Sequence, residues 1–366
     1  MAAHAPTPAP AATALADSGV EIPRTMRAIV QDAYGPALDV LTVDRVPVPV
    51  PSDDQVLVRV HAASIHVGDL VAIEGEPIVA RFATGLRKPS HRVPGTDVAG
   101  TVVAIGRSVR DLRVGDEVFG WCSGAFAEYA CAPAGQFLPK PSNLSFEQAS
   151  AVGVSATSAL QLLRDRSLLG RKVLINGASG GLGSYAVQIA AAFGSEVTGV
   201  CGPHNVETLH ALGATHVIDY TKEDFADGER RYDFILDNVA NHSLTRTRRV
   251  LTEDGILQSN NGTSGGRWFG TLGTVITTAI VSLFTRRQAP PAIKFTNRED
   301  LSVLKALIED GRVTPLIGRT YPLTEAARAV GHVGEGHARG TVVLSVVSAR
   351  GAHAAGAPSV QHEGTP

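Results

Sequence analysis

Glycine residues gather near the middle of the chain, in the stretch VLINGASGGLGSYAVQIAAAFG that begins at Val173. Glycines between an apolar run and a helical pattern let the backbone turn tightly and approach a ligand closely. The free amides and the dipole of the following helix attract an anion such as a pyrophosphate. The stretch therefore predicts a dinucleotide-binding turn, with the pattern Ala178-x-Gly180-x-x-Gly183. The residues of this turn are Ala178, Ser179, Gly180, Gly181, Leu182 and Gly183.

A glycine-rich turn also occurs for packing alone, so the surrounding elements decide between the two interpretations. Apolar residues recur at helical spacing from Leu182 to Phe193, and Gly194 ends that helix. Strand and helix patterns then alternate through EVTGVCG, HVIDY, YDFILD and GILQSN. This alternation predicts βαβ units on a parallel sheet. Asn238 and Asn260 follow the ends of two of these strands, where such sheets bind ligands.

The end of the strand after the turn, Val200-Cys201-Gly202, bears on which dinucleotide binds. An NAD site usually has Asp or Glu at this place to accept hydrogen bonds from the ribose. Because no carboxylate stands here to repel a 2′-phosphate, NADP(H) is favoured, with Cys201 and Gly202 lining its ribose. A phosphate site usually has Arg or Lys, whereas only His204 and Asn205 lie close by. Arg339 is either the source of that positive charge near the adenosine end or a solvated surface residue.

The pattern of predicted secondary structure divides the rest of the chain into domains and tails. From 26 to 146, short β-rich runs are broken by Gly and Pro, which predicts an antiparallel, barrel-like domain. The parallel-sheet domain is expected over 147–294, and a return to the first domain over 295–348. Residues 1–25 and 349–366 are small and polar and are expected to be disordered tails.

An uncharged stretch, WFGTLGTVITTAIVSLF, covers 268–284 within an insert at about 263–292. It is slightly short for a membrane span, which needs roughly 20 apolar residues, and it contains threonines and glycines. A buried helix, a lid over a pocket or a subunit interface is therefore expected rather than an integral membrane segment.

Composition limits the classes of function. The chain has 366 residues, of which 44% are hydrophobic, and a formal net charge of −2. These values are typical of a globular protein and give no electrostatic footprint for nucleic acid or an acidic membrane. The three scattered cysteines and the lack of a basic residue before Arg24 favour a cytoplasmic location.

Motifs along most of the chain resemble the medium-chain dehydrogenase/reductase superfamily, and most closely its zinc-free quinone oxidoreductase branch. They are RVPGTDVAGTVVAIG, VGDEVFG, GAFAEYACAP, INGASGGLGSYAVQIA, LGATHVIDY and GHARGTVVL, between about Arg27 and Val347. The resemblance implies an α/β fold, in which a GroES-like antiparallel β-barrel catalytic domain accompanies a Rossmann doubly wound parallel sheet. It also implies a homodimer that transfers hydride from NADPH to a small hydrophobic quinone, enone or other carbonyl compound, in a cleft between the domains.

The resemblance also allows zinc to be tested residue by residue. Zinc-dependent relatives carry Cys, then a Gly-His-Glu motif, then a second Cys. The matching positions here are His66, Gly95-Thr96-Asp97 and Gly153. A catalytic zinc needs about three N, S or O ligands from the protein, so no metal is expected.

Without a metal, reduction depends on cofactor positioning, a hydrogen-bond donor and exclusion of water. His66 is the candidate donor to the substrate oxygen, and the alternative is that it only shapes the pocket. Asp69 either orients His66 or holds the backbone of its turn.

Three further positions are matched to the cofactor by the resemblance. Thr157 corresponds to a residue near the nicotinamide, although it could instead cap or pack its helix. Tyr220 corresponds to a tyrosine beside the adenosine phosphate, and Asn205 falls where some relatives have a phosphate-binding lysine.

Two alternatives stay open. The chain could be an NADPH-binding interaction or sensor protein of weak activity, with the uncharged stretch as its contact surface. Within the enzymes, a zinc-independent alcohol dehydrogenase is the alternative, whereas a zinc-dependent one would require metal.

Overall fold

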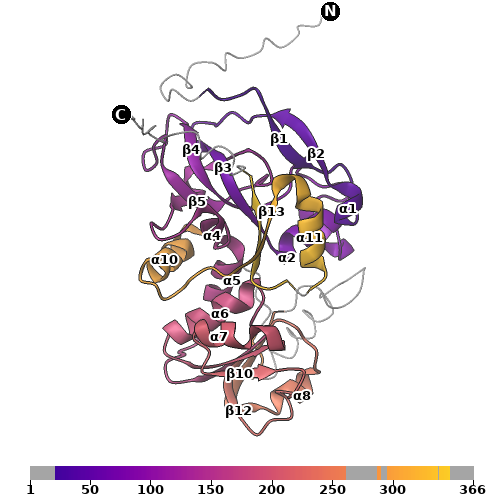
Figure 1. Cartoon of the computed structure of the whole chain (residues 1–366), viewed down its shortest axis with the longest axis vertical. Coiled ribbons are helices and arrows are strands. Elements are labelled where there is room, and N and C mark those ends of the chain that lie inside the picture. Colours follow the sequence, from indigo (N-terminus) through magenta and orange to yellow (C-terminus); the bar gives the residue numbers. More distant parts are fainter. Residues whose placement is uncertain (1–20, 261–286, 290–294, 337, 347–366) are drawn as a thin grey trace, which may run out of the picture.

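The computed structural model describes residues 21–260, 287–289, 295–336 and 338–346. Two large sheets organise these residues, one above and one below in Figure 1, with helices α5 (Gly153–Leu163) and α10 (Arg298–Glu309) between them. The uncharged stretch 268–284 and most of both expected tails lie outside the described residues. No described helix is both long enough and apolar enough to cross a membrane.

The first sheet has seven strands, and its long central strands are β3 and β4. Buried valines and alanines on both strands form its core, because β-branched and small side chains pack well on a pleated surface. The neighbours pair in the order β13-β14-β3-β4-β5-β7, and β6 pairs with β3. The strands are β3 (Gln55–Ile65), β4 (Asp97–Ile105), β5 (Glu117–Trp121), β6 (Tyr129–Pro133), β7 (Phe137–Pro139), β13 (Ile317–Pro322) and β14 (Thr341–Ser345).

Most of this sheet is antiparallel, as the turn-rich sequence predicts. The exception is the pair β13 and β14, which is parallel. Strand β14 pairs antiparallel with β3, so the C-terminal segment returns to the first sheet. A separate hairpin pairs β1 (Thr25–Val30) with β2 (Thr42–Pro47).

The second sheet is parallel, as the alternating pattern predicts. Its order is β10-β9-β8-β11-β12, so the chain runs outward from β8 to β10 and then crosses back to β11 beside β8. Ligands bind at such a switch point, beyond the carboxyl ends of the strands. The strands are β8 (Lys172–Asn176), β9 (Glu196–Cys201), β10 (His216–Asp219), β11 (Tyr232–Asp237) and β12 (Leu251–Ser259).

Helices cover both sheets. The longer ones pack by buried apolar faces, and the short ones close the connections between strands. Besides α5 and α10, they are α1 (Ala37–Val40), α2 (Val67–Glu74), α3 (Arg81–Thr84), α4 (Phe146–Ser150), α6 (Gly181–Ala192), α7 (Val206–Ala211), α8 (Leu244–Arg248) and α11 (Ala326–Gly334). Within the described residues, 3-10 turns lie at Ile78–Ala80, Ala134–Gln136, Pro203–Asn205 and Leu323–Glu325.

Helix α10 packs where the two halves of the chain meet. Its buried residues Leu301, Leu304 and Ile308 share a core with α5, α6 and the parallel sheet, and the helix also contacts β7. The sequence pattern predicts this helix in the segment that returns to the first domain, 295–348. In the structure, the apolar face of α10 packs against apolar surfaces of both α5 and β7.

Candidate active site

The glycine turn follows β8 at the switch point of the parallel sheet. Gly177 has a φ of +75°, and helix α6 begins at Gly181. A Cβ on Gly183 would lie only 2.1 Å from the Gly177 carbonyl oxygen, so this close approach requires glycine. No described side chain caps α6, which leaves its first amides free for an anion. This cradle fits a diphosphate.

The returning C-terminal segment lies on this turn. The amide of Gly340 donates to the Ser179 carbonyl oxygen at 2.8 Å. The neighbouring Arg339 reaches across to helix α7, where its guanidinium donates to the Thr208 hydroxyl. Arg339 is therefore held against the first turn of α7, the helix that follows β9.

The end of β9 carries no acidic side chain. Cys201 is buried, and Gly202 leads into the 3-10 turn before α7. Tyr220 is 58% exposed. Its hydroxyl lies close to Gly202, because a Cβ added to that glycine would be 3.1 Å from it. The amide oxygen of Asn205 is buried without a hydrogen-bond partner among the described residues. These four candidate residues therefore lie around one strand end.

Amide side chains connect the carboxyl ends of β8, β11 and β12. The Asn176 amide donates to Asp237 Oδ1 at 2.9 Å, and Asn238 Nδ2 donates to the Asn176 carbonyl oxygen at 3.0 Å. Asn260 Nδ2 donates to Asn238 Oδ1 at 2.9 Å. The predicted pair Asn238 and Asn260 is thus in direct contact beside the glycine turn.

His66 lies at the amino end of α2, where both of its ring nitrogens bond to the protein. Nδ1 accepts from the Gly68 amide at 2.9 Å, so in the neutral ring the proton is on Nε2. Nε2 then donates to the Thr96 hydroxyl at 2.7 Å. Only 12% of the His66 side chain is exposed. A direct hydrogen bond from His66 to substrate would therefore have to replace the contact with Thr96.

Asp69 is buried and bonds to both His66 and Thr96. Its Oδ2 accepts from the His66 backbone amide at 3.0 Å and lies 3.3 Å from His66 Nε2. The first contact closes a capping box at the start of α2, as expected of a residue that holds its turn. Thr96 donates to Asp69 Oδ1 at 3.4 Å. Burial raises the pKa of Asp69, although His66 opposes the shift.

Asp97 is a second buried carboxylate next to this cluster. It accepts from the Val154 amide at 2.9 and 3.1 Å, and from the Ser64 hydroxyl at 3.3 Å. Burial raises the pKa of Asp97 to about 6. A Cβ on Gly153 would lie 2.1 Å from Asp97 Oδ1, so glycine is what makes room for this carboxylate.

The side chains at the zinc-ligand positions do not fit zinc. His66 has no free ring nitrogen, Asp97 is engaged by α5, and Gly153 has no side chain. Within the described ranges, no three His, Cys, Asp or Glu side chains are grouped so that they could hold a metal ion. The donor set lacks the three converging ligands that a catalytic zinc needs, roughly 2 Å from the ion.

Helix α5 connects the histidine cluster with the glycine turn. The amide of Val154 donates to Asp97 in the histidine cluster. The hydroxyl of the next residue, Ser155, lies beside the glycine turn, where a Cβ added to Gly181 would be 3.5 Å from it. The two clusters therefore meet at the amino end of α5, between the sheets.

Thr157 lies one turn further along α5. Its hydroxyl donates to the Gly153 carbonyl oxygen at 2.8 Å and lies 3.2 Å from the Thr296 hydroxyl. Thr157 is buried, and these contacts are those of a residue that packs within its helix.

Two features of the site were not found from the sequence. Thr96 is separated from His66 by 30 residues, and only the pairing of β3 with β4 brings the two together. The direction of the Arg339 side chain depends on the packing of Gly340 against the glycine turn. No local spacing could have indicated either contact.

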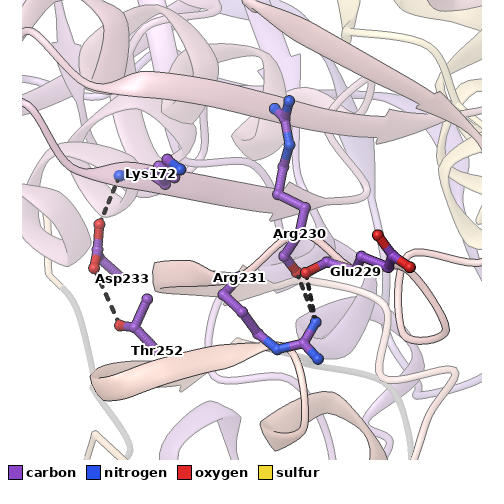
Figure 2. A pocket seen from close by; sticks show the side chains of 6 residues that line it. All are labelled: Lys172, Glu229, Arg230, Arg231, Asp233 and Thr252. Carbon is purple, nitrogen blue, oxygen red and sulfur yellow. Dashed lines mark hydrogen bonds between the residues drawn. The ribbon is translucent and has the colours of Figure 1, made fainter.

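A cavity of about 580 Å³ lies at the opposite edge of the parallel sheet (Figure 2). It is formed near the amino ends of β8, β11 and β12, away from the glycine turn. Asp233 accepts there from the Lys172 amide and the Thr252 hydroxyl, and Arg231 donates to the carbonyl oxygens of Gly228 and Glu229. The cavity lies at the other edge of the sheet from the glycine turn and is not part of the candidate site.

Comparisons with known proteins match both halves of the chain. A family model described as an alcohol dehydrogenase GroES-like domain matches residues 52–142, and one described as a zinc-binding dehydrogenase matches 212–344. Human quinone oxidoreductase is 31% identical, over 84% of this chain and 93% of its own length. The NADPH-dependent alkenal/one oxidoreductase of Arabidopsis thaliana chloroplasts is 30% identical, over 88% and 80%.

A solved structure has the same architecture. The quinone oxidoreductase of Coxiella burnetii aligns with a TM-score of 0.76 and 30% identity, over 88% of this chain and all of that one. The expected combination of a GroES-like domain with a Rossmann domain is confirmed by these matches.

Proposed function

From the premise that this chain belongs to the medium-chain dehydrogenase/reductase superfamily, and resembles its quinone oxidoreductases, we propose an NADPH-dependent reductase. Its acceptor is a quinone, an α,β-unsaturated ketone or another small hydrophobic carbonyl compound. The observation that carries the proposal is the uncapped glycine turn at the switch point, beside the cluster of His66, Thr96 and Asp69. The turn would hold the diphosphate of the dinucleotide, and the cluster of His66, Thr96 and Asp69 would face its reactive end across the amino end of α5.

NADP(H) is favoured over NAD(H) by the residues at the end of β9. An NAD site usually has a carboxylate there, and Cys201 and Gly202 provide none. Asp219, which pairs with Cys201 from β10, bonds to Thr221 and Lys222. Arg339, held against Thr208, supplies a guanidinium that suits a 2′-phosphate. Tyr220 and the unpartnered Asn205 oxygen, which lie at the same strand end, provide polar contacts for the adenosine.

The reaction proceeds without a metal in this proposal. The contacts of His66 and Asp97 leave no converging donors for zinc, so the polarisation of the acceptor oxygen falls to hydrogen-bond donors. When bound, NADPH supplies the hydride. The residues of this chain bind the diphosphate, hold the nicotinamide against the acceptor and exclude water from the junction. His66 acts through Thr96, because its Nε2 proton points to that hydroxyl.

We also propose a homodimer in the cytoplasm. The relatives' family commonly forms dimers, and the cysteines Cys122, Cys131 and Cys201 are all free, as in a reducing compartment. Light scattering on the purified chain tests the dimer.

The direct test is NADPH oxidation, followed at the nicotinamide absorbance, with a panel of quinones, enones and saturated ketones. We expect turnover with quinones or enones and slower turnover with NADH. Tight NADPH binding without turnover on any acceptor would favour the interaction or sensor protein instead. Turnover that requires added zinc would favour a zinc-dependent alcohol dehydrogenase.

A further inference from the structure

The Thr96 hydroxyl lies between a hydrogen-bond donor, His66, and a hydrogen-bond acceptor, Asp69. On one side, His66 Nε2 donates to its oxygen at 2.7 Å. On the other side lies Asp69 Oδ1, at 3.4 Å. Thr96 and His66 are both partly exposed, whereas Asp69 is buried. Both ring nitrogens of His66 already bond to the protein, so Thr96 is the one of the two whose proton is held only by a long contact, at 3.4 Å.

The tautomer of His66 determines what the Thr96 hydroxyl does. A backbone amide can only donate, so the Gly68 contact fixes Nδ1 as an acceptor and leaves the ring proton on Nε2. Thr96 thus receives a hydrogen bond from His66 and must direct its own proton elsewhere. It has two acceptors to choose from, namely ionised Asp69 and an acceptor oxygen placed in the junction.

We propose that Thr96, rather than His66, is the catalytic residue that donates to the substrate oxygen, with Asp69 as the proton source behind it. This inference rests on the proposed reductase function. His66 is a positioning residue, which holds the Thr96 oxygen so that its proton points to the substrate or to Asp69.

The acceptor receives its hydride and its proton from different donors. The acceptor gains a hydride at carbon and its carbonyl π electrons move to oxygen, while NADPH becomes NADP⁺. The oxygen takes the Thr96 proton, and Thr96 takes a proton from the carboxylic acid of Asp69. Asp69 is left as a carboxylate and regains its proton from water through Thr96 after the product leaves. An enol product returns to the ketone in water.

The surroundings of Asp69 suit this role. Burial raises its pKa and so favours the protonated acid. The titratable groups facing it are His66 from the same helix end, Asp97 from β4 and the buried Cys122. Asp97, which is itself engaged by α5, adds a repulsive charge whenever both carboxylates ionise.

The test compares Thr96→Val, which removes the hydroxyl, with Thr96→Ser, which keeps it. Thr101→Val is the matched control, because Thr101 bonds to His61 Nε2 at 3.1 Å in β4 and so loses an equivalent Thr–His contact away from Asp69. We expect Thr96→Val to lower kcat about 100-fold, which is the lower range for a lost acid catalyst, and to reduce the solvent deuterium isotope effect. Thr96→Ser and Thr101→Val should stay within about threefold of the wild type.

NADPH affinity should be unchanged in all three variants, which separates the chemical step from binding and folding. A Thr96→Val protein that folds, binds NADPH and keeps wild-type kcat would overturn the role of Thr96 and leave the reductase intact. If the wild-type protein oxidises NADPH with none of the tested acceptors, the proposed function is overturned, and the role of Thr96 with it.

The tautomer provides a readout that does not depend on turnover. In ¹⁵N-histidine spectra, assigned with a His66→Gln variant, we expect a protonated Nε2 and a bare Nδ1. A protonated Nδ1 would contradict the arrangement on which the donor role of Thr96 depends.

Discussion

Both carboxylate oxygens of Asp97 lie within hydrogen-bonding distance of the Val154 amide, at 2.9 and 3.1 Å. A buried acid in β4 thereby holds the amino end of α5, the helix that connects the histidine cluster with the glycine turn. Zinc-dependent relatives have metal ligands at the positions of Asp97 and Gly153. In this chain, the hydrogen bond between the Asp97 carboxylate and the Val154 amide connects β4 with α5 instead.

Gly153 is expected to be intolerant of any side chain. Gly153→Ala puts a methyl group 2.1 Å from Asp97 Oδ1 and must displace the carboxylate or the helix. The expected loss is about 1–3 kcal/mol in the free energy of unfolding, as for other overpacked sites. Urea unfolding measures it. Gly331→Ala in α11 is the control, because a Cβ there meets nothing within 4 Å; an equal loss at both sites would refute the crowding.

Asp97 should make stability depend on pH. Its folded pKa, about 6, lies above the usual 3.8, so the folded state favours the protonated acid, and stability is lost as pH rises through about 6. The wild type should therefore lose roughly 1–2 kcal/mol relative to Asp97→Asn between about pH 5 and about pH 8. Urea unfolding of both proteins at the two pH values checks this. A difference that stays constant, or changes in the opposite direction, would contradict a raised pKa of Asp97 in the folded state.

Arg339 should determine affinity for the 2′-phosphate. Arg339→Ala is expected to weaken NADPH binding about 10- to 100-fold, the range for a lost charge-assisted hydrogen bond, and to leave NADH binding nearly unchanged. Titration calorimetry with both coenzymes gives the ratio. Arg319→Ala removes an exposed arginine on β13 and serves as the control. Equal weakening of both coenzymes would assign Arg339 to the diphosphate or to folding.

A carboxylate at the end of β9 should reverse the preference. Gly202→Asp places an acid where NAD sites accept bonds from the ribose, so we expect weaker NADPH binding and equal or tighter NADH binding. Gly202→Asn, which has nearly the same shape without the charge, controls for contact with the nearby Tyr220 hydroxyl. The same result for both variants would point to crowding rather than charge.

Zinc should be dispensable. We expect elemental analysis of the active protein to give far less than one zinc per chain, and chelator treatment to leave NADPH oxidation unchanged. Stoichiometric zinc together with a loss of rate on chelation would contradict the geometry of His66, Asp97 and Gly153.

Local patterns in the sequence predicted the parallel sheet and the glycine turn, because both depend on neighbours along the chain. EVTGVCG and GILQSN, for example, form β9 and β12. Local spacing indicated Asp69 as a neighbour of His66, but not Thr96, which arrives through strand pairing. The contact between Asp97 and Val154 was also out of reach, because it forms only after α5 packs on β4. The direction of Arg339 likewise depends on a tertiary contact, the one between Gly340 and Ser179.

The central claim is that the turn after Asn176 binds the diphosphate of a nicotinamide dinucleotide, and calorimetric titration of the purified chain tests it most directly. We expect one NADPH per chain with micromolar affinity, and weaker binding of NADH. No detectable binding of either coenzyme would contradict the account.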